Sequence, residues 1–157
     1  MSGGDLAQPD APQSLPVEPG HFAAIVKRAS DEQLAAAMAA SRDQILGQIF
    51  AAMPRMLIAE RAADRSIVAD WEIVDADGAT HRFQVRIEAG RCSVIEGGDA
   101  DSNVRFRLGE IDFLKLVSGN ASGPELFVFG RLKIAGSLVL AARYPGLFTI
   151  PRPPDIG

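Results

Sequence analysis

The chain has 157 residues, of which 47% are hydrophobic and 23% charged, a composition typical of one globular domain. Sixteen basic and twenty acidic side chains give a formal net charge of −4, which argues against a general nucleic-acid-binding protein, because such proteins must neutralise phosphates. The single cysteine, Cys92, excludes an intramolecular disulfide and leaves too few sulfur ligands for a cysteine-based zinc site.

The two ends of the chain differ in composition from its middle. Residues 1–19 hold four prolines and almost no bulky apolar side chains, so we expect a disordered N-terminal tail. Residues 151–157 resemble a second, shorter tail, which leaves a folded domain over about 20–150. The N-terminus lacks the basic start and apolar core of a secretory signal, and no apolar run is long enough to span a membrane. The sequence therefore predicts a cytoplasmic protein.

The first part of the domain has helical periodicity. Residues 20–29 carry apolar side chains at helical spacing, and Ser30 begins a capping-box sequence that predicts a second helix to about Ala40. Residues 42–53 form the most amphipathic segment, and Pro54 is expected to end it or to start the next turn. Its apolar stripe consists of Ile45, Leu46, Ile49, Phe50 and Met53.

Alternating apolar and polar residues then predict strands over 67–74 and 80–88, joined by turn residues at 75–78. Their register follows from parity, because one face of each strand is apolar. Pairing Trp71 with Phe83 places Ala69 opposite Val85 and Ile67 opposite Ile87. The same register places Glu72 opposite Arg82 on the polar face.

The remaining elements alternate between strands and helices. Strands are expected over 91–96 and 103–108, and a helix over 110–118 with Gly119 as its stop signal. A short helix or turn at 125–129, a strand at 131–135 and a helix over about 137–143 complete the domain. This order predicts an α+β fold in which helices cover one face of a mostly antiparallel sheet.

The C-terminal third carries a family resemblance. The stretch Phe127-Val-Phe-Gly130-Arg131-Leu132-Lys133-Ile134-Ala-Gly136-Ser-Leu138 is similar to the signature of sterol carrier protein 2 domains. Upstream segments at 45–54, 71–78 and 112–119 resemble that family's first long helix, first hairpin and middle helix, in the same order. Ser137 departs from the aspartate or asparagine that bacterial relatives often have there, although serine can also cap a helix.

The resemblance implies a five-stranded sheet covered by helices over an apolar tunnel. It also implies binding of fatty acids, acyl-CoAs, sterols or phospholipids, with no cofactor. The apolar residues that would form the tunnel wall are Phe50, Met53, Trp71, Phe83, Phe106, Phe113, Leu116, Phe127, Leu132, Ile134, Leu138 and Phe148. The alternative is that these residues fill a solid core, which periodicity cannot distinguish from a hollow one.

Basic side chains offer contacts for a lipid head group. Arg131 and Lys133 lie in the signature strand and are the candidates there. Arginines 82, 86, 105 and 107 lie on the polar faces of predicted strands, where they could meet an anionic lipid or simply form a solvated face.

Catalytic and metal-binding motifs are weak. His21 and His81 have no neighbours at ligand or triad spacing, and Cys92 has the strand position of a small core residue. An EF-hand-like run starts at Asp99, but its sixth position is Val104 where glycine is needed. We therefore expect no catalytic residue and no metal site.

Two functions remain open at this stage. The first is a non-enzymatic carrier whose partner is a lipid or another hydrophobic small molecule, in transient contact with membranes and with no nucleic-acid partner. The second is an accessory or interaction module in a larger lipid-metabolism assembly, such as one for quinone biosynthesis. The apolar run at 138–142 fits either a tunnel wall or a dimer surface, so the oligomeric state stays open.

Overall fold

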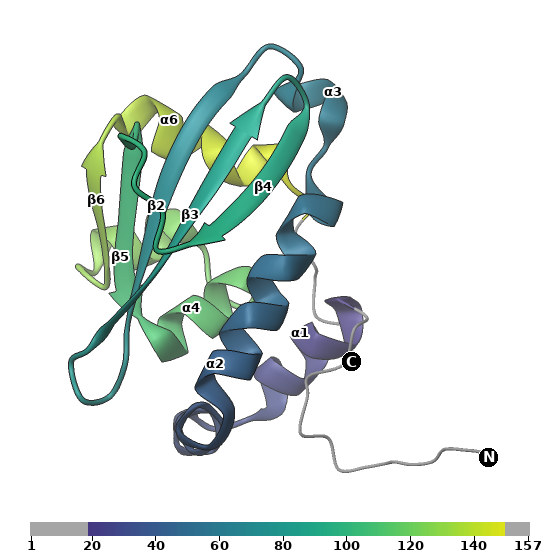
Figure 1. The fold of residues 1–157 in the computed structure, drawn as a ribbon. Helices are drawn as coiled ribbons and strands as arrows, with labels where there is room; N and C mark the ends of the chain where they lie inside the picture. The colour runs from purple at the N-terminus through teal and green to yellow at the C-terminus, as the bar shows by residue number, and fades with distance from the viewer. Residues whose placement is uncertain (1–18, 150–157) are drawn as a thin grey trace.

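The computed structural model describes residues 19–149 (Figure 1). The two expected tails lie outside these residues, except that Pro19 is the first residue of a helix. The fold is α+β, as the sequence predicts. Its helices are α1 (Pro19–Arg28), α2 (Asp31–Met56), α3 (Ala59–Ala62), α4 (Glu110–Val117), α5 (Gly123–Val128), α6 (Leu138–Arg143) and the 3-10 helix η1 (Tyr144–Leu147). Its strands are β2 (Ser66–Val74), β3 (Thr80–Glu88), β4 (Arg91–Glu96), β5 (Val104–Gly109) and β6 (Leu132–Gly136).

The two helices expected over 31–40 and 42–53 form one element, α2, that is kinked at Ser41. At its start the Ser30 hydroxyl accepts a hydrogen bond from the Gln33 amide, and the Gln33 side chain accepts one from the Ser30 amide, which completes the predicted capping box. Ser41 has φ −144° and ψ 35°, so the helix changes direction there. Pro54 lies inside the last turn, and the helix ends two residues later at Met56.

The sheet has the order β4-β3-β2-β5-β6. The predicted hairpin register is confirmed: Trp71 pairs with Phe83, Ala69 with Val85, and Glu72 with Arg82. Strands β3 and β4 and strands β5 and β6 also pair antiparallel, whereas β2 and β5 pair parallel. A parallel pair needs a crossover connection, and here the chain crosses from the β4 edge to β5 through residues 97–103.

This connection covers part of the sheet face that carries no helices. The side-chain amide of Gln84 donates both to Asp70 Oδ1 and to the carbonyl of Ala100, each at 2.9 Å. Gln84 and Asp70 are therefore buried although they belong to the polar face of their strands. Burial of these two groups is compensated because each has hydrogen-bond partners.

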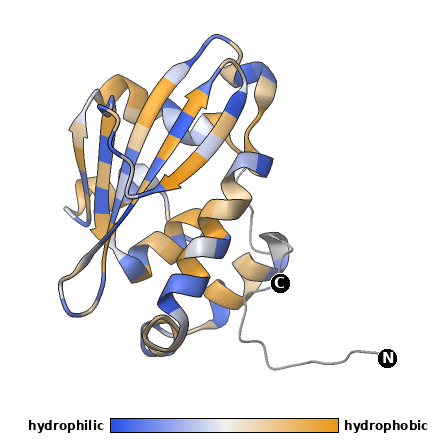
Figure 2. Cartoon of the chain, in the orientation of Figure 1, coloured by the Kyte–Doolittle hydropathy of each residue, from blue (hydrophilic) through white to orange (hydrophobic). Residues whose placement is uncertain are grey.

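Hydrophobic and hydrophilic residues alternate along the strands (Figure 2), and the buried apolar ones belong to the other face, where the helices pack. In Figure 1, α6 crosses behind the strands. Phe50 of α2 lies between two other rings and stacks on Phe83 with centroids 4.2 Å apart and on Phe113 with centroids 5.3 Å apart. This triple stack fills the space between α2, α4 and the sheet, so the core is solid at this end.

Candidate functional site

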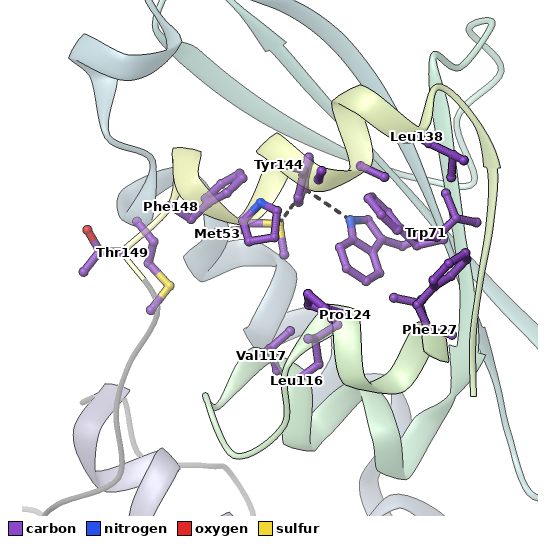
Figure 3. Close-up of a pocket in the computed structure, with 18 residues that line it drawn as sticks. Met53, Trp71, Leu116, Val117, Pro124, Phe127, Leu138, Tyr144, Phe148 and Thr149 are labelled. Atoms are coloured by element: carbon purple, nitrogen blue, oxygen red, sulfur yellow. Dashed lines mark hydrogen bonds between the residues drawn. The ribbon is translucent and has the colours of Figure 1, made fainter. Parts of the chain in front are cut away.

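A pocket of about 530 Å³ lies beside this solid core, between the sheet and the helices α4, α5 and α6 (Figure 3). Its volume is in the range of small-molecule sites. Trp71 and Phe106 line it from the sheet, and β6 forms another wall. Within residues 19–149, the lining consists of Met53, Met56, Trp71, Phe106, Leu116, Val117, Gly123, Pro124, Phe127, Leu132, Ile134, Leu138, Ala141, Ala142, Tyr144, Pro145, Phe148 and Thr149.

None of the lining residues that the structure describes carries a charged side chain, and among them only Trp71, Tyr144 and Thr149 have nitrogen or oxygen atoms in their side chains. The Trp71 indole N–H donates to the Tyr144 hydroxyl at 3.2 Å. That hydroxyl donates in turn to the sulfur of Met53 at 3.6 Å. A cavity with so few polar groups favours an apolar occupant, because a polar ligand would lose its hydration without compensation.

The C-terminal segment closes one side of the pocket. Thr149 N–H donates to the Met56 carbonyl at 2.8 Å, and Ile58 N–H donates to the Leu147 carbonyl at 2.7 Å. Leu57 and Phe148 form a β-bridge between these two bonds. The end of α2 and the segment after η1 are therefore held together by backbone hydrogen bonds, which places Met53 and Phe148 on the same wall.

Nine of the twelve residues named as tunnel candidates line this pocket. They are Met53, Trp71, Phe106, Leu116, Phe127, Leu132, Ile134, Leu138 and Phe148. The other three, Phe50, Phe83 and Phe113, form the triple ring stack of the solid core. Whether a lipid contacts the nine residues stays a prediction.

Sequence reasoning missed several lining residues, of which Tyr144 is the most informative. It is buried, and its ring lies against those of Trp71, Phe106 and Phe148 with centroids 5.9, 5.3 and 5.1 Å apart. It is the only tyrosine in the chain, and this was the one feature of the sequence that could have drawn attention to it. Its position in a short 3-10 helix gave no periodicity from which a pocket-facing side chain could be predicted.

Exposed apolar side chains extend the pocket wall outward. Phe127 and Leu138 line the pocket and are 45% and 59% exposed. Val128, Phe129 and Val139 follow them on the surface and are also exposed. We call Phe127, Val128, Phe129, Leu138 and Val139 the apolar rim. An exposed apolar group of this kind next to a pocket is typical of a binding surface.

The two basic candidates of the signature strand do not line the pocket. Arg131 Nε and Nη2 each lie 2.9 Å from a carboxylate oxygen of Asp112. This contact raises the pKa of the Arg131 guanidinium and joins the start of β6 to α4. Lys133 is exposed on the open face of β6, opposite Arg107.

The structure explains why particular residues stand at the neighbouring signature positions. Gly136 has φ +89°, and a side chain there would collide with the backbone carbonyl of Asn103. Gly130, at φ +75°, turns the chain from α5 into β6. The Ser137 hydroxyl accepts a hydrogen bond from the Leu140 amide, so the departure at this position still caps α6.

The arginines of the open face are largely paired. Arg82 and Arg105 lie 3.2 and 3.5 Å from Asp70 Oδ2, and Arg107 lies 3.1 Å from Glu72. Arg86 donates to the side-chain oxygen Oε1 of Gln84 and lies 3.8 Å from Asp99. Because this face lies on the opposite side of the sheet from Trp71 and Phe106, its charges do not reach the pocket.

The residues considered for catalysis lie apart from the pocket. His81 Nε2 lies 2.9 Å from Asp75 Oδ2 and is part of a polar cluster with Arg42 and Glu110. Burial raises the pKa of the Cys92 thiol to about 11.

Within residues 19–149, no three histidine, cysteine or acidic side chains are grouped so that they could hold a metal ion. The helices of this part also lack the combination of length and apolar character that a bilayer-crossing segment needs.

Comparison with known proteins finds a matching family and a curated relative. Residues 58–149 match the SCP-2 sterol transfer family. The oleate-induced peroxisomal protein POX18 of Candida maltosa is 31% identical over 61 residues, which are 39% of this chain and 48% of that protein. The chain thus matches about half the length of this curated relative.

Among solved structures, the sec-alkylsulfatase Pisa1 from Pseudomonas sp. aligns with a TM-score of 0.59 and 14% identity, over 68% of this chain and 17% of that enzyme. Sterol carrier protein 2 from Yarrowia lipolytica aligns with a TM-score of 0.49 and 23% identity, over 57% of this chain and 69% of that protein. The Pisa1 alignment supports the fold. The family match covers more than half of the chain, and the chain therefore belongs to the SCP-2 sterol transfer family.

Proposed function

We propose that this protein binds a hydrophobic lipid in the pocket beside Trp71 and carries or presents it without covalent chemistry. The observation that supports this most is the pocket itself, which has a volume of about 530 Å³ and no charged side chain among the described residues of its wall. Each Å² of apolar lipid surface removed from water contributes about 25 cal/mol before ordering costs. The ligand class comprises fatty acids, acyl-CoAs, sterols and phospholipids, with any charged head group left at the apolar rim.

Family membership supports the same function, since the family is described by sterol transfer. The lipid-binding unit in this proposal spans about residues 20–150. The proposed compartment is the cytoplasm, although POX18 is named as a peroxisomal protein. A fluorescent fusion observed in the native cell distinguishes the two compartments.

The first test is native mass spectrometry of the purified protein, with extraction and identification of any lipid that co-purifies. A matched pair of variants makes the test specific. Phe127 and Phe129 lie at the same end of α5 and are both exposed, but only Phe127 lines the pocket. Phe127→Arg places a charge at the pocket wall and is expected to abolish lipid binding, whereas Phe129→Arg is expected to retain it.

The proposal fails if the protein carries no lipid and added acyl chains or sterols leave the fluorescence of Trp71, the only tryptophan, unchanged. It also fails if both arginine variants bind lipid as the original protein does. Circular dichroism of each variant checks that the fold is intact.

The apolar rim supports a second candidate function, assembly with another copy of this chain. Val128, Phe129 and Val139 are 64–77% exposed and would be covered in a dimer. Light scattering after gel filtration tests this candidate: a dimer that dissociates in Phe129→Arg supports it, and a monomer at all concentrations contradicts it.

A further inference from the structure

The proposed function leaves open which end of a lipid enters the pocket and which chemical group the pocket recognises. Among the described wall residues, the buried polar side-chain groups come together at one point, where Trp71, Tyr144 and Met53 meet (Figure 3). The indole N–H donates to the Tyr144 oxygen at 3.2 Å, and the Tyr144 hydroxyl donates to the Met53 sulfur at 3.6 Å. Thr149, which also has a polar side chain and lines the pocket, lies apart from this point in Figure 3.

The Tyr144 hydroxyl donates its hydrogen bond to a weak acceptor, the sulfur of Met53. A thioether sulfur accepts hydrogen bonds poorly, whereas a hydroxyl or carbonyl oxygen accepts them well. A ligand oxygen that reached this point would therefore replace Met53 as the acceptor. The indole N–H would keep its bond to the phenol oxygen, and this bond makes the hydroxyl a better donor by polarising it.

The Met53 side chain can move away from the Tyr144 hydroxyl with little loss of free energy. Methionine has an unbranched side chain with several rotatable bonds, so it adapts to a new neighbour more readily than a ring does. Met53 itself lines the pocket, so its side chain borders the space that the ligand would occupy. Trp71 is held on a central strand of the sheet and provides the fixed side of the arrangement.

The charge of the recognised group follows from the same surroundings. Within residues 19–149, no lysine, arginine or histidine lines the pocket, so a carboxylate or phosphate at this point would find no counter-charge in this part of the wall when it lost its hydration. Burial raises the pKa of Tyr144 above its usual value, and the hydrogen bond from Trp71 opposes this only in part. The hydroxyl thus stays protonated and remains a donor over the physiological pH range.

We propose that the Tyr144 hydroxyl is the recognition point of the pocket and that it selects lipids whose buried end carries an uncharged oxygen acceptor, a hydroxyl or a carbonyl. This inference rests on the proposed function, because it assumes that a lipid occupies the pocket. It adds a direction to binding: the neutral oxygen lies inside at Tyr144, and any hydrocarbon tail runs toward the apolar rim.

The test compares two ligands of equal chain length, 2-dodecanone and dodecane, by their effect on Trp71 fluorescence. In Tyr144→Phe the affinity for the ketone is expected to fall about three- to ten-fold, as for the loss of one hydrogen bond, while the affinity for dodecane stays the same. Met53→Leu removes the competing acceptor at similar volume and is expected to raise the affinity for the ketone relative to that for dodecane.

A second readout does not depend on a folded Tyr144 variant. The infrared carbonyl band of 13C-labelled 2-dodecanone is expected to shift to lower frequency when bound to the original protein and to Met53→Leu, as in a hydrogen-bonded ketone. A band at the frequency found in hydrocarbon solvent would overturn the inference. An equal loss of both ligands in Tyr144→Phe would overturn it too.

The two levels of the proposal fail in different ways. If dodecane and the ketone both bind but with no role for Tyr144, the pocket binds lipid and only the recognition point is wrong. If neither ligand binds the original protein, the lipid-binding function itself is overturned.

Discussion

Arg131 and Asp112 form a bidentate ion pair, in which Nε and Nη2 of the arginine each lie 2.9 Å from a different carboxylate oxygen. The pair joins the residue just before β6 to the first turn of α4, and both elements supply residues of the pocket wall. Asp112 is buried, whereas the Arg131 side chain is 56% exposed. The geometry favours a positioning role for Arg131 over a contact with a lipid head group.

A double-mutant cycle with Arg131→Ala and Asp112→Ala tests this role. Because Arg131 is largely exposed, we expect a coupling free energy of only about 0.5–1 kcal/mol in urea unfolding. The affinity for a charged lipid such as dodecanoate should change by less than about two-fold in Arg131→Ala if Asp112 is its main partner. A ten-fold loss for dodecanoate but not for dodecane would instead assign Arg131 to the head group.

Gly136→Ala is expected to destabilise the protein by more than about 1 kcal/mol, because this position has positive φ and the new methyl group would meet the Asn103 carbonyl. Gly47→Ala is the matched control. Gly47 lies in α2 with open space around it, so alanine there should stabilise the protein by about 0.5–1 kcal/mol. The urea midpoint should fall in Gly136→Ala and rise in Gly47→Ala. An unchanged midpoint in Gly136→Ala would contradict the close approach of this position to the Asn103 carbonyl.

Asp70 links stability to pH. Burial alone would raise the pKa of its carboxyl, but hydrogen bonds from Gln84, Ser102 and Arg82 outweigh it and lower the pKa below the usual value. A lowered pKa in the folded state stabilises the protein above the unfolded-state pKa of about 3.9, and this contribution is lost as the pH falls through the folded-state value.

Asp70→Asn should therefore lower the free energy of unfolding by about 1–3 kcal/mol at pH 7, since charged hydrogen bonds are lost in a buried site. The difference from the original protein should shrink as the pH is lowered below about 4. Urea unfolding between pH 7 and pH 3 measures it. A difference that stays constant over this range would mean that the charge of Asp70 contributes nothing.

Cys92 should react slowly with thiol reagents. Its pKa of about 11 is two units above the ordinary value of 9.0 because the thiol is partly buried, so at pH 8 its thiolate fraction is about 100-fold lower than that of an exposed cysteine. Alkylation by iodoacetamide, followed by mass spectrometry, should speed up steadily from pH 7 to pH 10 without a plateau. Rapid alkylation at pH 7 would point to an activated thiol and reopen a catalytic role.

The hairpin shows how much local pattern determines. Apolar residues alternate with polar ones in both strands, so only one register puts Trp71 and Phe83 on the same face and Glu72 beside Arg82. The structure has that register along the whole of β2 and β3. The capping box at Ser30 and the stop at Gly119 were equally predictable, because both depend on residues that are neighbours in the chain.

The open face of the sheet shows where local pattern fails. Asp70 and Gln84 alternate like solvent-exposed residues, yet both are buried under the connection from β4 to β5. The parallel pairing of β2 with β5 makes that crossover necessary. No property of residues 67–88 indicates that a distant segment lies on them.

The difference between core and pocket is the clearest case. Phe83 and Phe106 both pair with Trp71, one in β3 and one in β5, and the alternation within each strand predicts that both face the helices. In the folded chain Phe83 stacks on Phe50, whereas Phe106 borders the pocket, and the alternation predicts no such difference. Periodicity fixes the direction of a side chain relative to its own strand. What fills the space opposite is set by helices from other parts of the chain, and their placement follows from packing over the whole domain.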